Sequence, residues 1–229
     1  MRGFDLIVPF AARQKEMPFL LEGAPETLPF AQALSGIMPE KFEHIFIALL
    51  AEDDRRLEMS PRIRESFAAH GWEKRLEIVS LPEATTCEAE TIAETLERTG
   101  SRGSFWVKDP DNFFRAEPIP ENVVTAFPLD ALVRVNPQNK SYLSISDGDY
   151  ILNIAEKRVI GRHFCTGGYG FADGEEFLAT FRRLKNLGRL YISHIIYQML
   201  LDDILFRPLY VSDYQDWGSR EDWLECLGK

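Results

Sequence analysis

Short apolar runs alternate with helical patterns through the first half of the chain. Four runs of four to eight residues predict buried strands, at residues 4–9, 43–50, 75–81 and 104–107. The segments between them carry helix signals. This alternation predicts an α/β fold: a Rossmann-like mixed sheet with a parallel core, flanked by helices on both faces.

Two helix starts are predicted between these strands. Ser60 followed by Pro61 is typical of an N-cap and a first helical position. The segment Thr85-Thr86-Cys87-Glu88 is a candidate capping box, and the helix after it should end before Gly100. Its apolar residues follow helical spacing, at Ala89, Ile92, Ala93 and Leu96.

The second half begins with short β-rich runs separated by turn chemistry such as Asp147-Gly148. Runs at 141–146, 150–154 and 168–171 indicate a hairpin elaboration of the sheet. Helices are expected at 174–187 and 192–201, then a strand at 207–213 and a terminal helix with Ser219 as N-cap. No repeat or linker interrupts the pattern, so residues 1–229 are expected to form one domain.

Composition narrows the function classes. The net charge of −10, from 36 acidic and 26 basic residues, argues against a general nucleic-acid binder but leaves room for a phosphorylated small substrate. Cys87, Cys165 and Cys226 are widely spaced, which argues against a disulfide framework or a structural zinc site. No apolar run is long enough for a membrane helix or a signal peptide. A cytoplasmic protein without a membrane partner is therefore expected, and an oligomer is possible.

The first candidate site follows the fourth predicted strand. Asp109 and Asp111 flank a proline directly after the strand ends. Ligands of open α/β sheets bind at the carboxyl ends of the strands, and paired carboxylates there can hold Mg²⁺, which in turn holds phosphates. An acidic turn that merely ends the strand is the alternative.

Three further segments join Asp111-Asn112 in one ordered pattern. They are Ala155-Glu156-Lys157, Gly168-Tyr169-Gly170-Phe171 and Asp216-Trp217-Gly218-Ser219. With them, from about residue 4 to residue 223, the sequence resembles the sugar-phosphate nucleotidyltransferases, the nucleotide-sugar pyrophosphorylase-like family. The resemblance implies a sheet of the nucleotide-diphospho-sugar transferase or glycosyltransferase-A-like type.

The resemblance also implies roles for single residues. Asp111 and Asp216 would hold the catalytic Mg²⁺, with Asp109 as a possible helper. Glu156 would contact sugar hydroxyls, Lys157 the sugar phosphate, and Gly168 would let the backbone approach the sugar. Thr86 lies in a segment similar to the family's helix start near the nucleotide, although Cys87 replaces the expected glycine.

The loop after the first strand departs from the family pattern. The family has glycines and a Pro-Lys pair there, whereas this chain has PFAARQKEMPF, in which Met17 stands about where the lysine belongs. Side chains with a Cβ keep the loop backbone farther from phosphates than glycine would. Arg13 or Lys15 could replace the missing phosphate-binding cation, and solvated surface charge is the alternative for both.

The implied reaction is nucleotidyl transfer from a nucleoside triphosphate to a sugar phosphate, with release of pyrophosphate. Such chemistry depends mainly on positioning and charge neutralisation. Two other classes stay open: a non-catalytic sugar-nucleotide-binding or regulatory protein of the same fold, and a metal-dependent glycosyltransferase that uses Asp109 and Asp111 and a finished nucleotide sugar.

Overall fold

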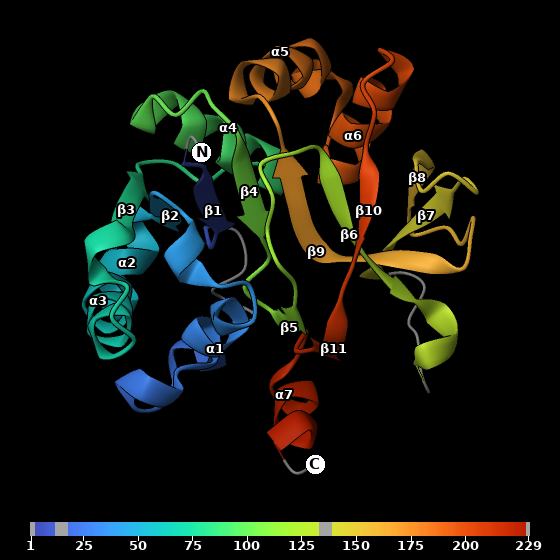
Figure 1. Cartoon of the computed structure of the whole chain (residues 1–229). Helices are drawn as coiled ribbons and strands as arrows, with labels where there is room; N and C mark the ends of the chain where they lie inside the picture. Colours follow the sequence, from blue (N-terminus) through green and yellow to red (C-terminus); the bar gives the residue numbers. More distant parts are fainter. Residues whose placement is uncertain (1–2, 12–17, 133–138, 228–229) are drawn as a thin grey trace.

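One mixed sheet organises the chain (Figure 1). In the computed structural model, which describes residues 3–11, 18–132 and 139–227, nine strands form this sheet in the order β10-β6-β9-β4-β1-β2-β3, with β7 and β8 attached at β9. The strands are β1 (Asp5–Pro9), β2 (Ile45–Leu50), β3 (Leu76–Leu81), β4 (Phe105–Lys108), β6 (Val123–Pro128), β7 (Ser141–Ile145), β8 (Ile151–Glu156), β9 (His163–Phe171) and β10 (Arg207–Tyr210). Two further strands, β5 (Asn112–Arg115) and β11 (Ser212–Asp216), pair separately.

The four strands predicted in the first half form the parallel part of the sheet. β1 pairs in parallel with β2 and β4, and β2 pairs in parallel with β3. Antiparallel β9 joins this part to β6. Successive side chains of β1 point to opposite faces of the sheet and enter two different cores. Leu6 and Val8 lie in one core, and Ile7 lies in the other. Both faces of the sheet are therefore buried, and the predicted α/β architecture with a mixed sheet is confirmed.

Helices cover each face. The core that contains Ile7 is closed by α4 (Glu88–Thr99), α5 (Gly174–Leu184) and α6 (Ile192–Leu201), which lie along the top of Figure 1. The core that contains Leu6 is closed by α1 (Pro29–Ser35) and α3 (Met59–Ala69), and Trp223 of α7 packs against it. α2 (Ala51–Leu57) leads directly from β2 into α3, and α7 spans Arg220–Leu227. No helix among the described residues is long and apolar enough to cross a membrane.

Two predicted helix starts are wrong. α3 begins at Met59, so Ser60 lies inside the helix; the Asp54 carboxylate accepts hydrogen bonds from the Ser60 amide at 2.7 Å and from its hydroxyl at 2.5 Å. The capping function thus comes from a side chain six residues earlier. α4 begins at Glu88 after Cys87, which makes no side-chain cap. Gly100 ends α4 in the left-handed conformation, as predicted.

The C-terminal strand differs from its prediction in a way that shapes the site. Residues 207–213 do not form one strand: β10 stays in the main sheet beside β6, and β11 leaves it. β11 pairs antiparallel with β5, with Asp216 opposite Asn112. The predicted hairpin of β7 and β8 is present, and the Ser219 hydroxyl accepts from the Asp222 amide at the start of α7, as expected of an N-cap.

Candidate functional site

Two hollows meet at the end of β4. A polar pocket of about 340 Å³ lies between the end of β4, the β7–β8 hairpin, β9, β11 and the start of α6. A second hollow of about 460 Å³ follows the carboxyl ends of β1, β2 and β4 and the segment before α4. Both are lined by Asp109 and Asp111, and also by Glu88, Arg189 and Tyr191. The edge of the sheet predicted to bind a ligand is therefore hollowed on both sides of the two aspartates.

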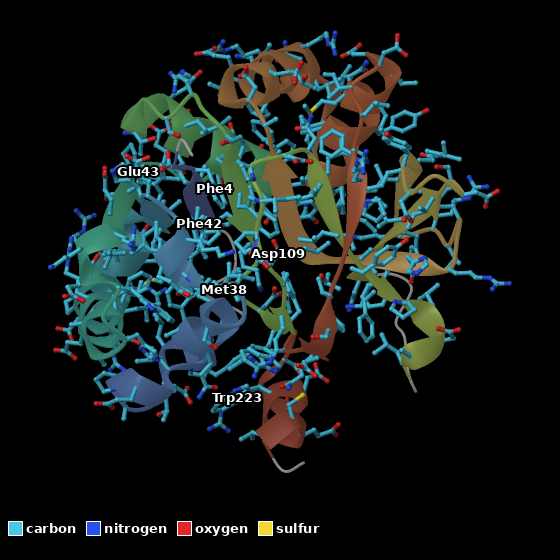
Figure 2. All side chains as sticks on the ribbon, in the orientation of Figure 1. Phe4, Met38, Phe42, Glu43, Asp109 and Trp223 are labelled. Atoms are coloured by element: carbon cyan, nitrogen blue, oxygen red, sulfur yellow. The ribbon has the colours of Figure 1, made fainter. Side chains whose placement is uncertain are left out.

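A buried lysine shapes the turn that carries the aspartates. Lys108, fully buried at the end of β4, donates hydrogen bonds to the Asp109 carbonyl at 2.6 Å and to the Asn112 carbonyl and side-chain oxygen at 2.9 and 2.7 Å. Its ammonium also lies 4.6 Å from the centre of the Phe114 ring. Burial lowers the pKa of Lys108 to about 8. The interactions hold the turn from Asp109 to Asn112 closed, with Asp109 near the centre of the molecule (Figure 2).

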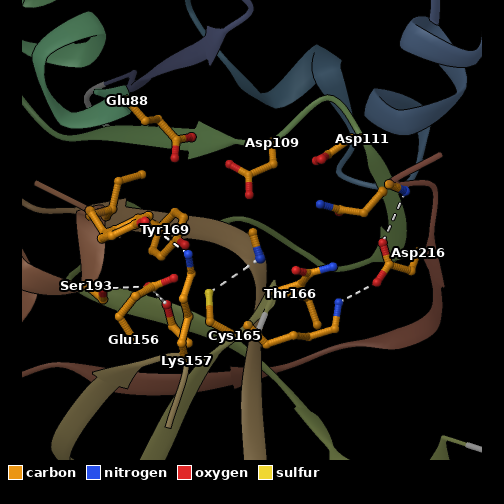
Figure 3. Close-up of a pocket in the computed structure, with 18 of the residues that line it drawn as sticks. Glu88, Asp109, Asp111, Glu156, Lys157, Cys165, Thr166, Tyr169, Ser193 and Asp216 are labelled. Carbon is orange, nitrogen blue, oxygen red and sulfur yellow. Dashed lines mark hydrogen bonds and ion pairs between the residues drawn. The ribbon is translucent and has the colours of Figure 1, made fainter. Parts of the chain in front are cut away.

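Asp216 reaches the same pocket through the β5–β11 pair. The Trp217 amide donates to the Asp111 carbonyl at 2.9 Å, so the two segments are joined backbone to backbone. Asp111 and Asp216 both line this pocket (Figure 3). Asp216 is an ion-pair partner there, however: its Oδ2 lies 2.5 Å from Lys140 Nζ, and its Oδ1 accepts from the Gly218 amide at 3.2 Å.

A metal site of Asp109, Asp111 and Asp216 stays a prediction. Within the described residues, no group of three or more His, Cys, Asp or Glu side chains is arranged to hold a metal ion. Asp109 and Asp111 line both hollows, and Asp216, which lines the polar pocket, pairs with Lys140.

Glu156 and Lys157 lie where the sequence predicts, at the end of β8 and in the lining of the polar pocket. The Glu156 carboxylate accepts from the hydroxyls of Ser141 at 2.5 Å and Ser193 at 2.9 Å, which fixes its orientation. Lys157 has a left-handed backbone, with φ of 58°, and its ammonium donates to the Tyr191 hydroxyl at 3.0 Å. Both side chains can contact a polar ligand in this pocket.

The glycine prediction needs a correction of one residue. Gly168 is not among the residues that line the pocket; its Cα faces Phe114 and Thr125, and a Cβ there would lie 2.7 Å from each side chain. The β9 glycine in the pocket wall is Gly167, with φ of 83°. A Cβ on Gly167 would lie 2.4 Å from Asp109 Oδ2, so this glycine provides the space that the Asp109 carboxylate occupies.

Thr86 belongs to the second hollow, whereas two other predicted residues cannot be placed in either one. Thr86 lines the second hollow, exposed, with its hydroxyl donating to Glu90 at 2.7 Å. Arg13 and Lys15, the candidate phosphate-binding cations, lie outside the described residues. Their part in the site stays a prediction.

Sequence analysis missed Lys140. Although it stands among polar residues just before β7, it is only 8 % exposed. Its ammonium donates to the Tyr214 hydroxyl at 2.7 Å and lies 5.2 Å from the centre of the Phe164 ring. Burial, followed by the nearby Asp216 carboxylate, raises the pKa of Tyr214 well above its usual value. No local pattern marks this lysine, because its burial comes from β9 and β11.

Cys165 and Tyr169 form the buried floor of the pocket. Burial raises the pKa of the Cys165 thiol to about 12, so the sulfur is protonated at neutral pH. The Gly167 amide lies 3.4 Å from that sulfur. A thiol in this state is a small packing group rather than a nucleophile.

Comparison with solved structures identifies the fold. The chain is similar to a nucleoside-diphosphate-sugar pyrophosphorylase from Vibrio cholerae RC9, with a TM-score of 0.80 and 18% identity over 98% of this chain and 100% of that one. It is also similar to the inositol-1-phosphate CTP transferase from T. maritima, with a TM-score of 0.73 and 13% identity over 96% and 91% of the two chains.

A third similar structure is UDP-glucose pyrophosphorylase complexed with UDP-glucose, with a TM-score of 0.74 and 12% identity over 99% and 98%. No protein-family model and no curated protein matches the sequence. The chain thus has a sugar-phosphate nucleotidyltransferase-like fold, as the motif pattern predicts.

Proposed function

We propose that the chain is a nucleotidyltransferase that joins a nucleoside triphosphate to a sugar phosphate and releases pyrophosphate. The observation that carries the proposal is the pair of hollows that meet at Asp109 and Asp111. A two-substrate transfer needs two binding sites that share one reaction centre. The named activities of the three similar structures support the same reaction class.

The donor nucleotide is assigned to the hollow beside the parallel strands, which Thr86 lines. The acceptor is assigned to the polar pocket, where Glu156 is oriented by two serine hydroxyls. A carboxylate held in this way can accept hydrogen bonds from sugar hydroxyls. Lys157 stands at the same strand end and supplies positive charge for an acceptor phosphate.

The residues around the turn fit Mg²⁺. Asp109 and Asp111 offer only oxygen ligands, and Gly167 leaves the space in which the Asp109 carboxylate stands. Mg²⁺ is commonly held by one or two carboxylates, with waters and substrate phosphates completing its coordination. Bound there, the cation would neutralise developing charge on the phosphates. Lys108 holds the turn so that both aspartates stay at the junction of the hollows.

In the proposed reaction an oxygen of the acceptor phosphate attacks the α-phosphorus of the triphosphate. A new phosphorus–oxygen bond forms while the bond to pyrophosphate breaks, and pyrophosphate leaves with the electron pair. The chain's contribution is to align the two phosphates and to balance their charge, since no protein nucleophile is needed.

Pyrophosphate release tests the proposal. The purified protein is incubated with Mg²⁺, each common nucleoside triphosphate and a panel of sugar phosphates, and release is compared with the Asp111→Asn variant. Asp147→Asn is the matched control, because Asp147 is exposed in the β7–β8 turn. We expect release from the native chain and the control, and a loss of about 100-fold or more in Asp111→Asn. Binding of nucleotide sugars without any turnover would instead indicate a binding protein.

A further inference from the structure

Lys140 is a charged side chain built into the wall of the acceptor pocket. It is buried, lines the pocket, and contacts the rings of Phe164 and Tyr214 at 5.2 and 5.1 Å from their centres. Its ammonium has three N–H donors, and two of them are used among the described residues, by Asp216 and the Tyr214 hydroxyl. The third can serve a ligand in the pocket.

The partner of Lys140 is the residue for which the sequence predicts a metal. Asp216 uses one carboxylate oxygen for Lys140 and the other for the Gly218 amide. The Lys140 ammonium lies 2.5 Å from Asp216 Oδ2, so a cation bound by Asp216 would lie close to a second positive charge. Binding of the cation would also break the ion pair of Lys140, and a buried charge without its partner is costly. The contacts of Asp216 therefore fit a lysine-positioning role better than a metal-binding one.

The position of Lys140 in the pocket indicates what it binds. Asp216 directly precedes Trp217, whose amide donates to the Asp111 carbonyl. The Lys140–Asp216 pair therefore lies on the side of the pocket that is next to Asp111. Lys157 lies across the pocket in Figure 3, where it bonds to Tyr191. Lys157 is also exposed, whereas the buried Lys140 attracts an anion through less screening water.

We propose that Lys140 binds the phosphate of the acceptor in addition to Lys157, and that Asp216 with Tyr214 positions Lys140 instead of holding the metal. The inference deepens the proposed function and rests on it for the identity of the acceptor. The phosphate that must approach the nucleotide at Asp109 and Asp111 then meets a cation that is fixed before binding. A preorganised cation loses little side-chain freedom when the phosphate arrives.

Two binding measurements on the intact protein test this assignment. Orthophosphate binding is followed by calorimetry, and Mn²⁺ binding by electron paramagnetic resonance, for Lys140→Met, Lys140→Arg, Asp216→Asn and Asp216→Ala. Arg115→Gln is the control for loss of an exposed charge, because Arg115 pairs with Asp213 at the surface of the same β5–β11 ribbon. Thermal unfolding verifies that each variant is folded.

We expect Lys140→Met to weaken orthophosphate binding about ten- to hundredfold, and Lys140→Arg to retain part of it. Asp216→Asn keeps an oxygen acceptor for Lys140 and should bind orthophosphate better than Asp216→Ala. Neither Asp216 variant should lose Mn²⁺ binding, whereas Asp111→Asn should. The control should match the native chain in both measurements.

Unchanged orthophosphate binding in Lys140→Met overturns the proposal, as does loss of Mn²⁺ binding in Asp216→Asn. These outcomes are separable from failure of the proposed function. If Lys140-dependent phosphate binding is found but no triphosphate yields pyrophosphate, the phosphate site stands and the transferase activity does not. If pyrophosphate release in Lys140→Met keeps the native KM for the acceptor, the activity stands and this inference falls.

Discussion

Replacing Gly167 with alanine tests whether the space around the Asp109 carboxylate matters for function. The new Cβ would lie 2.4 Å from Asp109 Oδ2 and 2.7 Å from Asn112 Nδ2. Ordinary contact begins near 3.4 Å, so the carboxylate would have to retreat by about 1 Å. The Asn112 side chain can yield only by disturbing its hydrogen bond from Lys108. The substitution therefore displaces one of the two aspartates at the junction of the hollows.

The expected loss can be separated into two effects. Gly167 has φ of 83°, and an alanine in the left-handed region costs roughly 1–2 kcal/mol of stability. Gly100 has φ of 73° with nothing within 4 Å of a built Cβ, so Gly100→Ala carries the backbone cost alone. The extra effect in Gly167→Ala is the displacement of Asp109. A misplacement of about 1 Å at a reaction centre reduces turnover roughly 100-fold.

Pyrophosphate release per folded protein and Mn²⁺ affinity are measured for both variants, and unfolding is followed by circular dichroism. We expect Gly100→Ala to be less stable but fully active, and Gly167→Ala to lose both turnover and metal affinity. If the two variants have equal activity per folded molecule, the position of the Asp109 carboxylate is not what the site depends on. The reasoning from the missing Cβ would then be refuted.

Three other predictions concern separate parts of the molecule. Lys157→Ala should weaken binding of a sugar phosphate more than binding of a free nucleotide, measured by calorimetry; an equal effect on both would make Lys157 an ordinary surface residue. The Cys165 thiol should resist iodoacetamide in the folded protein at pH 8, where a pKa of about 12 leaves almost no thiolate. Prompt labelling of Cys165 at pH 8, seen by mass spectrometry, would contradict its burial. Asp54→Ala should lower the free energy of unfolding by about 1 kcal/mol in a urea titration, since it removes the acceptor of the Ser60 amide, and turnover should not change.

Local patterns were sufficient to predict the parallel strands and the aspartates that follow β4. β2 and most of β1 are continuous apolar runs because both faces of the sheet are covered there, and such runs are visible in sequence. The edge strand β3 contains the exposed residues Glu77 and Ser80. Asp109 and Asp111 could be placed because a strand end and its following turn are adjacent along the chain. These predictions needed no knowledge of distant contacts.

The missed features depend on contacts that the local sequence pattern does not show. Ser60 looks like an N-cap, but Asp54 takes that function because α2 runs directly into α3. Gly168 and Gly167 are neighbours in sequence, and only the packing of Phe114 and Asp109 decides which glycine faces the pocket. In the sequence Lys140 resembles a surface lysine, because the residue that contacts it, Tyr214, lies 74 residues later in the chain.

The departure of β11 from the main sheet has a consequence for the order in which the chain acquires its site during synthesis on the ribosome. The β1–β4 half that carries Asp109 emerges first, and the wall that contains Tyr214 and Asp216 comes from the penultimate element. Nascent chains that stop before β11 would contain both aspartates of the junction but not the partner of Lys140. Binding of phosphate in the acceptor pocket should therefore appear late in translation, after the C-terminal segment has paired with β5.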